Sequence, residues 1–304
     1  MNHAPLFLAP TLNESSRVVR RSIAALAGLL ALTAALPAAA QSGTWTNAAG
    51  GSWTATSNWS SGTIASGTGN TANFSTLNLT ANATVSLNGA RTIGLLSFGD
   101  TTPSHNWIVN TGSGGSLTLA RSGSAPEISV TSSTTTINAV LAGTVGMSKI
   151  GAGTLALGAV NTYTAATQVS AGTLLVTGSL AAGTTTTVSS TGTLAGTGTL
   201  NGPVVINATL APGNQGIGTL TAKGTLTLGS SSQTLMEISK AGAIPTADLV
   251  SGITTLTMGG TLTVTLRVGS EALEHGDTFT LFSATTRSGA FASVVLPTLP
   301  AGYS

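Results

Sequence analysis

Hydrophobic and polar residues alternate one by one along much of the chain. Three such runs are "SLTLA" at 116–120, "TLTLG" at 225–229 and "TLTVTLRV" at 261–268. A period of two is that of the β-strand, in which successive side chains point to opposite faces. In the last run Leu262 and Val264 would share one face, and Thr261 and Thr263 the other. The pattern predicts short strands, each with one aliphatic face.

The tripeptide Gly-Thr-Leu recurs along the chain. It begins at Gly153, Gly172, Gly192, Gly198, Gly218, Gly224 and Gly260. The first three copies are almost evenly spaced, and the pair at 192 and 198 returns as the pair at 218 and 224. Regular spacings of this kind are typical of solenoids, in which each turn covers the aliphatic face of its neighbour. We predict an all-β fold, a parallel β-solenoid of about ten to thirteen rungs.

The beginning of the chain has a different pattern. Arg17, Arg20 and Arg21 precede an apolar run that ends in small residues at Ala38 and Ala40. This order predicts a secretory signal peptide at 1–40, cleaved after Ala40, although the paired arginines leave a twin-arginine route open. No second membrane-length segment follows, so we expect no transmembrane segment in the mature chain.

The remaining chain divides into three predicted parts. Residues 41–90 hold three tryptophans and many small polar residues, and we expect an N-terminal Trp-rich cap or first irregular rungs, because the open end of a solenoid needs cover. The solenoid repeats occupy 91–268. Residues 269–304 are expected to be C-terminal rungs of a stack that is complete or truncated, with Phe279, Phe282 and Phe291 suited to closing it.

Charge is scarce in this sequence. Charged residues make up 6% of it, against about 25% in an ordinary soluble domain. Without residues 1–40 the chain keeps seven basic residues (10 minus 3) and seven acidic ones (8 minus 1), and its net charge is zero. Nucleic-acid binding needs a basic stripe, so we exclude that class of function. The chain has no Cys, and we expect no metal and no cofactor.

One cluster of ionisable residues stands out, "EALEHGD" at 271–277. Glu271, Glu274 and Asp277, with His275, are residue types that serve as acid–base groups or metal ligands. The alternative is a solvated turn between two strands, marked by Gly276 and Asp277. We favour the turn, because nothing elsewhere in the sequence offers an obvious partner, and we expect no enzymatic activity.

The three tryptophans of the predicted cap are Trp45, Trp53 and Trp59. Exposed side by side, they would form an aromatic platform for a sugar. Buried, they would cover the open end of the core, and this is the interpretation we favour. Asn161 and Tyr163 are expected to be structural, with Asn in a turn and Tyr packed over the adjoining rung.

The stretch "KIGAGTLALGAVNTYTAATQVSAGTLLV" at 149–176 resembles the autotransporter-associated β-strand repeat, a PATR-like repeat of bacterial passenger proteins. The similarity continues through 192–228, and 43–62 and 90–100 are similar to the openings of such passengers. The resemblance implies a right-handed parallel β-helix displayed at or beyond the outer membrane of a Gram-negative-type cell.

The sequence departs from that family in two places. Ala165 and Ala166 stand where family members have Gly-Gly after Tyr-Thr, so a turn of another kind is expected there. The last segment lacks a series of amphipathic strands of about ten residues, so we expect no translocator barrel in this chain. It would then be a truncated passenger or a protein exported without its own barrel.

These observations favour an exported, non-catalytic surface protein with a structural or adhesive role. The partners expected are a cell-surface or extracellular polysaccharide, or further copies of the chain. Two alternatives use the same scaffold. One is a lyase or glycosidase acting on extracellular polysaccharide through the acidic turn at 271–277. The other is a carbohydrate-binding module that uses the tryptophans.

Overall fold

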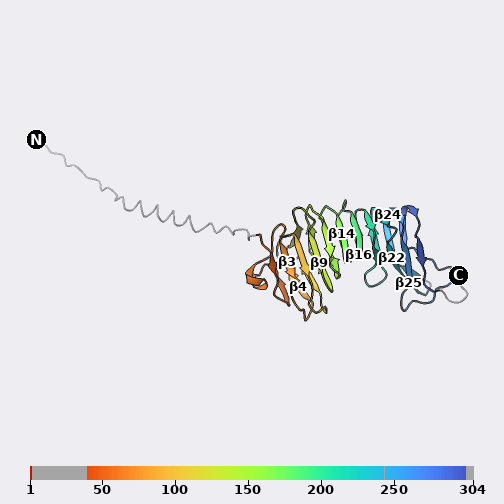
Figure 1. Ribbon diagram of the computed structural model, residues 1–304, viewed down its shortest axis with the longest axis horizontal. Helices are drawn as coiled ribbons and strands as arrows, with labels where there is room; N and C mark the ends of the chain where they lie inside the picture. Colours follow the sequence, from red (N-terminus) through yellow and green to blue (C-terminus); the bar gives the residue numbers. More distant parts are fainter. Residues whose placement is uncertain (2–39, 243, 299–304) are drawn as a thin grey trace. The chain divides into compact units, whose positions relative to one another are not determined.

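The computed structural model describes Met1, residues 40–242 and residues 244–298. The predicted signal peptide lies outside the described residues except at its two ends. The chain from Ala40 onward is one compact unit. Its described residues form 27 short strands and two single-turn 3-10 helices, η1 (Thr56–Asn58) and η2 (Ser60–Gly62). Figure 1 shows the labelled strands following one another along this unit in chain order, with β3 and β4 near one end and β24 and β25 near the other.

The strands stack into three faces, which we number 1 to 3. Face 1 contains eleven strands in the described chain, and each pairs in parallel with the next. They are β1 (Gly43–Thr44), β3 (Thr71–Phe74), β6 (Leu95–Phe98), β9 (Glu127–Val130), β12 (Met147–Ile150), the first halves of β14 (Thr167–Val176) and β16 (Thr186–Gly196), β18 (Val204–Ile206), β21 (Thr225–Leu228), the second half of β24 (Leu249–Met258), and β26 (Phe282–Gly289).

Face 2 also contains eleven parallel strands in the described chain. They are β2 (Gly50–Ser52), β4 (Ala83–Ser86), β7 (Trp107–Asn110), β10 (Thr134–Ile137), β13 (Thr154–Leu157), the second halves of β14 and β16, β19 (Thr209–Pro212), β22 (Gln233–Ala241), β25 (Thr261–Leu266) and β27 (Ser293–Val295).

Face 3 is less continuous than the other two. It contains β5 (Arg91–Ile93), β8 (Ser116–Leu119) and β11 (Val140–Ala142), then β15 (Ser179–Leu180), β17 (Thr199–Leu200), β20 (Thr219–Ala222) and the first half of β24. One antiparallel hairpin interrupts the pattern, where β23 (Ile244–Ala247) folds back on β22. The chain therefore coils as a parallel β-solenoid, and the predicted fold class is confirmed.

The rungs vary in length more than the repeat of Gly-Thr-Leu indicates. On face 1 the shortest paired step runs from Thr186 to Val204, and the longest runs from Leu95 to Glu127. The tripeptides at 153, 172 and 192 do stack on face 2. Those at 198 and 218 lie on face 3 and the one at 224 lies on face 1. The tripeptides at 192 and 198 and those at 218 and 224 therefore occupy different faces of the coil. The spacing between these two pairs is not the length of a rung.

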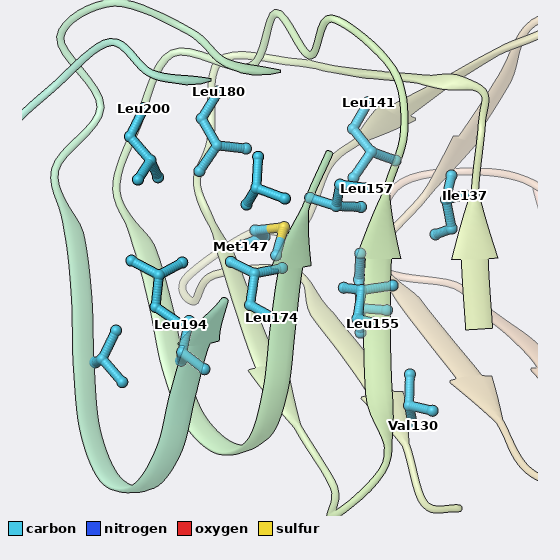
Figure 2. Packing of buried hydrophobic residues seen from close by; sticks show 14 of the residues in the cluster. Val130, Ile137, Leu141, Met147, Leu155, Leu157, Leu174, Leu180, Leu194 and Leu200 are labelled. Carbon is cyan, nitrogen blue, oxygen red and sulfur yellow. The ribbon is translucent and has the colours of Figure 1, made fainter. Parts of the chain in front are cut away.

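The interior is a set of aliphatic columns that run from rung to rung. On face 2 one column is Leu155, Leu174, Leu194 and Leu210, all at most 1% exposed. Figure 2 shows the first three of these following one another between the walls of the coil. Each fully buried side chain of this kind contributes about 1.5–3 kcal/mol. The columns are what makes a short strand stable in this fold.

The backbone at Gly172, the first residue of one repeated tripeptide, accepts only glycine. This residue has a φ of 61°, and a Cβ there would collide with the carbonyl oxygens of Gly151 and Gly153 in the rung below. The departure at Ala165 and Ala166 is accommodated differently. Neither alanine has a positive φ, so the turn after Thr164 is of a kind that alanine adopts without strain.

Candidate functional site

The outer surface of face 2 carries a groove of about 650 Å³ that crosses successive strands. We call it the threonine groove. One side is a row of threonines, the floor is aliphatic, and the far side is a loop that contains amide side chains. Its lining includes Thr134, Thr154, Thr173, Leu175, Ala195, Ala211, Asn214, Gln215, Glu237 and Asp248.

The threonine row follows from the register of face 2. Thr134 pairs with Thr154, Thr154 with Thr173, and Thr173 with Thr193, which in turn pairs with Thr209. Parallel in-register pairing places identical side chains one above another, at the strand spacing of about 4.8 Å. Within the described residues no side-chain hydrogen bond involves the hydroxyl of any of these five threonines, and all five side chains are partly exposed to solvent.

The floor of the groove comes from the outward position two residues further along each strand. There Ala156, Leu175, Ala195 and Ala211 stack in register, and the last three of them line the groove. Although they point outward, Ala156 and Ala195 are only 6% and 9% exposed. The small side chains are therefore recessed between larger neighbours, and this recess is the hollow of the groove.

The loop at 213–216 forms one wall. Gly213, which has a positive φ of 96°, exchanges two hydrogen bonds of 2.9 Å with Gly196. Asp248 is 1% exposed, and its Oδ1 accepts the N–H of Gly218 at 2.9 Å, while its Oδ2 accepts that of Glu237 at 2.8 Å. The wall is thus anchored to the strands behind it. Asn214 and Gln215 are exposed on its surface.

Charge in the groove is confined to one end. Burial raises the pKa of Asp248, while the N–H groups of Glu237 and Gly218 oppose that rise. Glu237 pairs with Arg267 at 3.1 Å, and both side chains are partly exposed. Both oxygens of Asp248 are already bonded to backbone N–H groups, so its carboxylate acts as a brace for the wall.

The acidic turn at 271–277 has a partner that the sequence did not indicate. Lys240 Nζ from β22, in a side chain that is 4% exposed, lies 2.8 Å from Glu274 Oε2 and 3.0 Å from Asp277 Oδ2. Hydrogen bonding to Glu274 raises the pKa of Lys240 despite the opposing effect of burial. The N–H of Glu274 and the ammonium of Lys240 lower the pKa of Asp277. Glu271 Oε2 accepts the N–H of Gly242 at 2.9 Å.

Glu274 and Asp277 are thus bound to β22, and Glu271 is bound to Gly242 just after the end of that strand. The turn also borders a cleft of about 390 Å³, lined mainly by apolar side chains such as Ile238, Val264, Leu273 and Phe279. His275 lines the same cleft. Among residues 40–242 and 244–298 no three His, Asp or Glu side chains are grouped as a metal ion would require.

The three tryptophans of the N-terminal segment are packed against one another. Trp45 and Trp53 are fully buried and Trp59 is 2% exposed. Trp59 lies edge-on to both, with ring centroids 5.1 Å apart, and Phe74 contacts all three. Each indole N–H donates to a backbone carbonyl, at Asn47, Ala65 and Trp53 respectively. The rings therefore form part of the buried core and offer no exposed face on which a sugar could stack.

Two charged residues that the sequence left without a role are buried in the solenoid wall. Lys149 is fully buried, and its Nζ donates to the carbonyls of Ile150, Gly151 and Ala171 at 2.7–3.0 Å. Burial lowers its pKa to about 8. Asp100 is 4% exposed. Burial alone would raise its pKa, but four backbone N–H donors hold it at about 2.

The residues Asn161 and Tyr163 connect rungs. Asn161 Oδ1 accepts the N–H of Leu141 in the rung before at 2.9 Å, and its Nδ2 donates to the carbonyl of Ser179 in the rung after at 3.1 Å. Tyr163 is fully buried and shares a hydrogen bond of 2.6 Å with Thr167. Burial raises the pKa of Tyr163 to about 12. Both side chains therefore have structural partners.

A comparison with protein families matches residues 147–176 to the passenger-associated-transport-repeat (PATR). The chain carries an autotransporter-passenger repeat. The PATR segment contains β12, β13 and β14, and so covers one full turn of the solenoid and the start of the next. Lys149, Asn161 and Tyr163 all belong to it.

The chain is also similar to a curated protein, the adhesin BmaC autotransporter of Brucella suis biovar 1 (strain 1330). The two are 42% identical over 93 residues, which are 31% of this chain and 2% of that protein. The predicted resemblance to autotransporter passenger repeats is confirmed by these two findings. No helix among the described residues has the length and apolar character needed to span a membrane.

Proposed function

We propose that this chain is an exported, adhesin-like passenger segment that presents binding surface outside a Gram-negative cell and catalyses no reaction. The observation that carries the proposal is the PATR segment built into a continuous parallel solenoid. Similarity to an adhesin autotransporter supports the adhesive role. The outer surface of face 2, with its row of unpartnered threonine hydroxyls, supplies a surface suited to many weak contacts.

The ionisable groups support a non-catalytic role. A glycosidase needs two carboxyl groups that face a substrate with separate protonation states. Here Glu274 and Asp277 are bound to Lys240, and Asp248 is bound to two backbone N–H groups. Each of these three acids therefore stabilises a turn or a loop through these contacts.

Adhesion and catalysis are distinguishable in one experiment. Beads coated with the full chain are passed under flow over glass coated with neutral polysaccharides, anionic polysaccharides or extracellular-matrix proteins, and albumin-coated beads serve as the control. We expect retention above the control on at least one coating, with no sugar released into the effluent. Retention at the control level on every coating would contradict an adhesive role, and released sugar would support the enzymatic alternative.

The Lys240 contacts allow a separate test of the enzymatic alternative. Replacing Glu271, Glu274 and Asp277 together by Gln, Gln and Asn removes the carboxylates from the turn. We expect bead retention to stay within about twofold of that of the unmodified chain, because the turn lies apart from the lining of the threonine groove. Loss of a sugar-releasing activity in this variant would instead assign catalysis to the turn.

A further inference from the structure

We propose that the threonine groove binds a neutral, linear, β-linked polysaccharide that lies along the solenoid axis with one sugar unit per rung. This inference deepens the proposed function, because it gives the adhesive surface a location and a ligand class. It assigns binding to residues other than Trp45, Trp53 and Trp59. The argument rests on the direction of the groove, its chemistry and its charge.

The direction of the groove requires a long ligand. Its lining extends from Thr134 in β10 to Thr263 in β25 and so crosses several successive rungs. Equivalent positions recur at the strand spacing of about 4.8 Å, which is close to the length of one β-linked hexose unit. Successive sugars of a linear β-1,4-linked polymer alternate in orientation, so such a polymer can place the same edge of a sugar against every second rung.

The chemistry of the lining matches the two kinds of surface that a pyranose ring presents. Its equatorial hydroxyls lie on the ring edge, and its C–H groups form the ring faces. Thr134, Thr154 and Thr173 line the groove with hydroxyls that both donate and accept. The floor of Leu175, Ala195 and Ala211 offers apolar contact for the C–H faces. Asn214 and Gln215 add amide groups on the opposite wall, a combination typical of ligand sites.

The backbone of face 2 excludes a peptide strand as the ligand. An extended peptide binds a sheet by pairing with the unpaired N–H and C=O groups of an edge strand. In the groove these groups are already paired within the parallel ladder, from β10 to β19. A peptide lying across the strands would gain no ladder hydrogen bonds, and over the floor its backbone groups would face aliphatic side chains.

Charge selects a neutral polymer over an acidic one. The threonine row and the floor carry no charged side chain, and the charged end of the groove holds Glu237 and Asp248 against the single Arg267. The carboxylates of an acidic polysaccharide would find no cation along the row and the floor, and at the charged end they would meet Glu237, which is paired with Arg267. We therefore expect neutral glucans to bind and polygalacturonate to bind more weakly.

The test is isothermal titration calorimetry of the full chain with cellohexaose, laminarihexaose and hexagalacturonate. Three variants are compared, with thermal melting as a check of folding. Thr154→Val with Thr173→Val removes two groove hydroxyls and keeps their shape. Ala195→Glu places a charge on the floor. The matched control is Thr187→Val with Thr227→Val, which removes two outward hydroxyls from face 1.

We expect binding of at least one neutral hexasaccharide and about tenfold weaker binding by the Thr154/Thr173 variant, because that variant loses two hydrogen bonds to the ligand. Ala195→Glu should abolish the binding, and the face 1 control should bind within twofold of the unmodified chain. The inference is overturned if neither neutral hexasaccharide binds, if hexagalacturonate binds more tightly, or if the groove variants bind as the unmodified chain does. Bead retention on a protein coating alone would then preserve the proposed function without this site.

Discussion

Lys149 makes the stability of the solenoid depend on pH in a way that can be measured. Its side chain occupies a column whose neighbours in adjacent rungs are Ile128 and Val169, both fully buried. An ammonium group in this position has lost its water, and the three carbonyls that it contacts replace that water only in part. The result is the lowered pKa of about 8, against 10.5 for an ordinary lysine.

The sign of the effect follows from where the proton is held more tightly. Between about pH 8 and pH 10.5 the unfolded chain keeps the proton on Lys149 and the folded chain releases it. The free energy of unfolding therefore rises with pH in this window. With 1.36 kcal/mol for each pKa unit, the gain between pH 7 and pH 10 is about 2.5 kcal/mol. Above pH 10 the raised pKa of Tyr163 acts in the opposite direction, so the measurement should stop there.

The assay is urea unfolding of the unmodified chain and of Lys149→Met at several pH values from 7 to 10. Met has a similar length and no charge, so the variant should lose most of the pH dependence. The absolute stability of the variant does not enter the test, because the carbonyls of Gly151 and Ala171 lose a hydrogen-bond donor at every pH. The matched control is Lys223→Met, at an exposed position, which should keep the slope of the unmodified chain.

Two results would refute this reasoning. If the unmodified chain shows constant or falling stability from pH 7 to pH 10, burial of Lys149 does not lower its pKa as described. If the chain and Lys149→Met show the same rise, another group is responsible. The free energy of unfolding must rise equally with pH in the unmodified chain and in Lys223→Met for either comparison to be valid.

Three further predictions concern other buried groups. Asn161→Ala should lower the free energy of unfolding by about 2–4 kcal/mol, because two rungs lose their shared side-chain hydrogen bonds; the midpoint of urea unfolding measures this, and a change below about 0.5 kcal/mol would contradict it. Stability should fall as the pH drops from about 4 towards 2, since the folded-state pKa of Asp100 lies below its usual 3.8, and acid unfolding of Asp100→Asn should show a smaller fall over that range. Native tryptophan emission should resist quenching by acrylamide, because Trp45, Trp53 and Trp59 are at most 2% exposed; quenching as strong as in urea would show that the rings are accessible.

The sequence predicted the fold well because its information is local and repeated. Alternation with period two fixed the strands, and Gly-Thr-Leu at 153, 172 and 192 gave the true step between rungs on face 2. It gave a false step where the same tripeptide serves other faces, at 198, 218 and 224. The tripeptide indicates which residues form a strand, but it does not indicate which face of the coil contains that strand.

The candidate site was less predictable, because its geometry depends on pairing between distant residues. A Thr-rich strand is visible in the sequence, but the groove needs the register that places Ala156 and Ala195 in one recessed column. The partner of the acidic turn, Lys240, lies far from it in the sequence, in a strand that is neighbouring only once the chain has coiled. Similarly, no local signal shows that Lys149 points inward, since Lys residues are almost never buried.

Exposure outside the cell is the central claim about this protein, and labelling of intact bacteria tests it most directly. Antibodies raised against residues 41–304 are applied to intact and to permeabilised cells of the native bacterium, and the culture medium is assayed in parallel. A cytoplasmic protein provides the control for cell integrity. We predict labelling of intact cells, or recovery of the chain from the medium, while the control stays unlabelled. Labelling that appears only after permeabilisation, with none of the chain in the medium, would contradict the account.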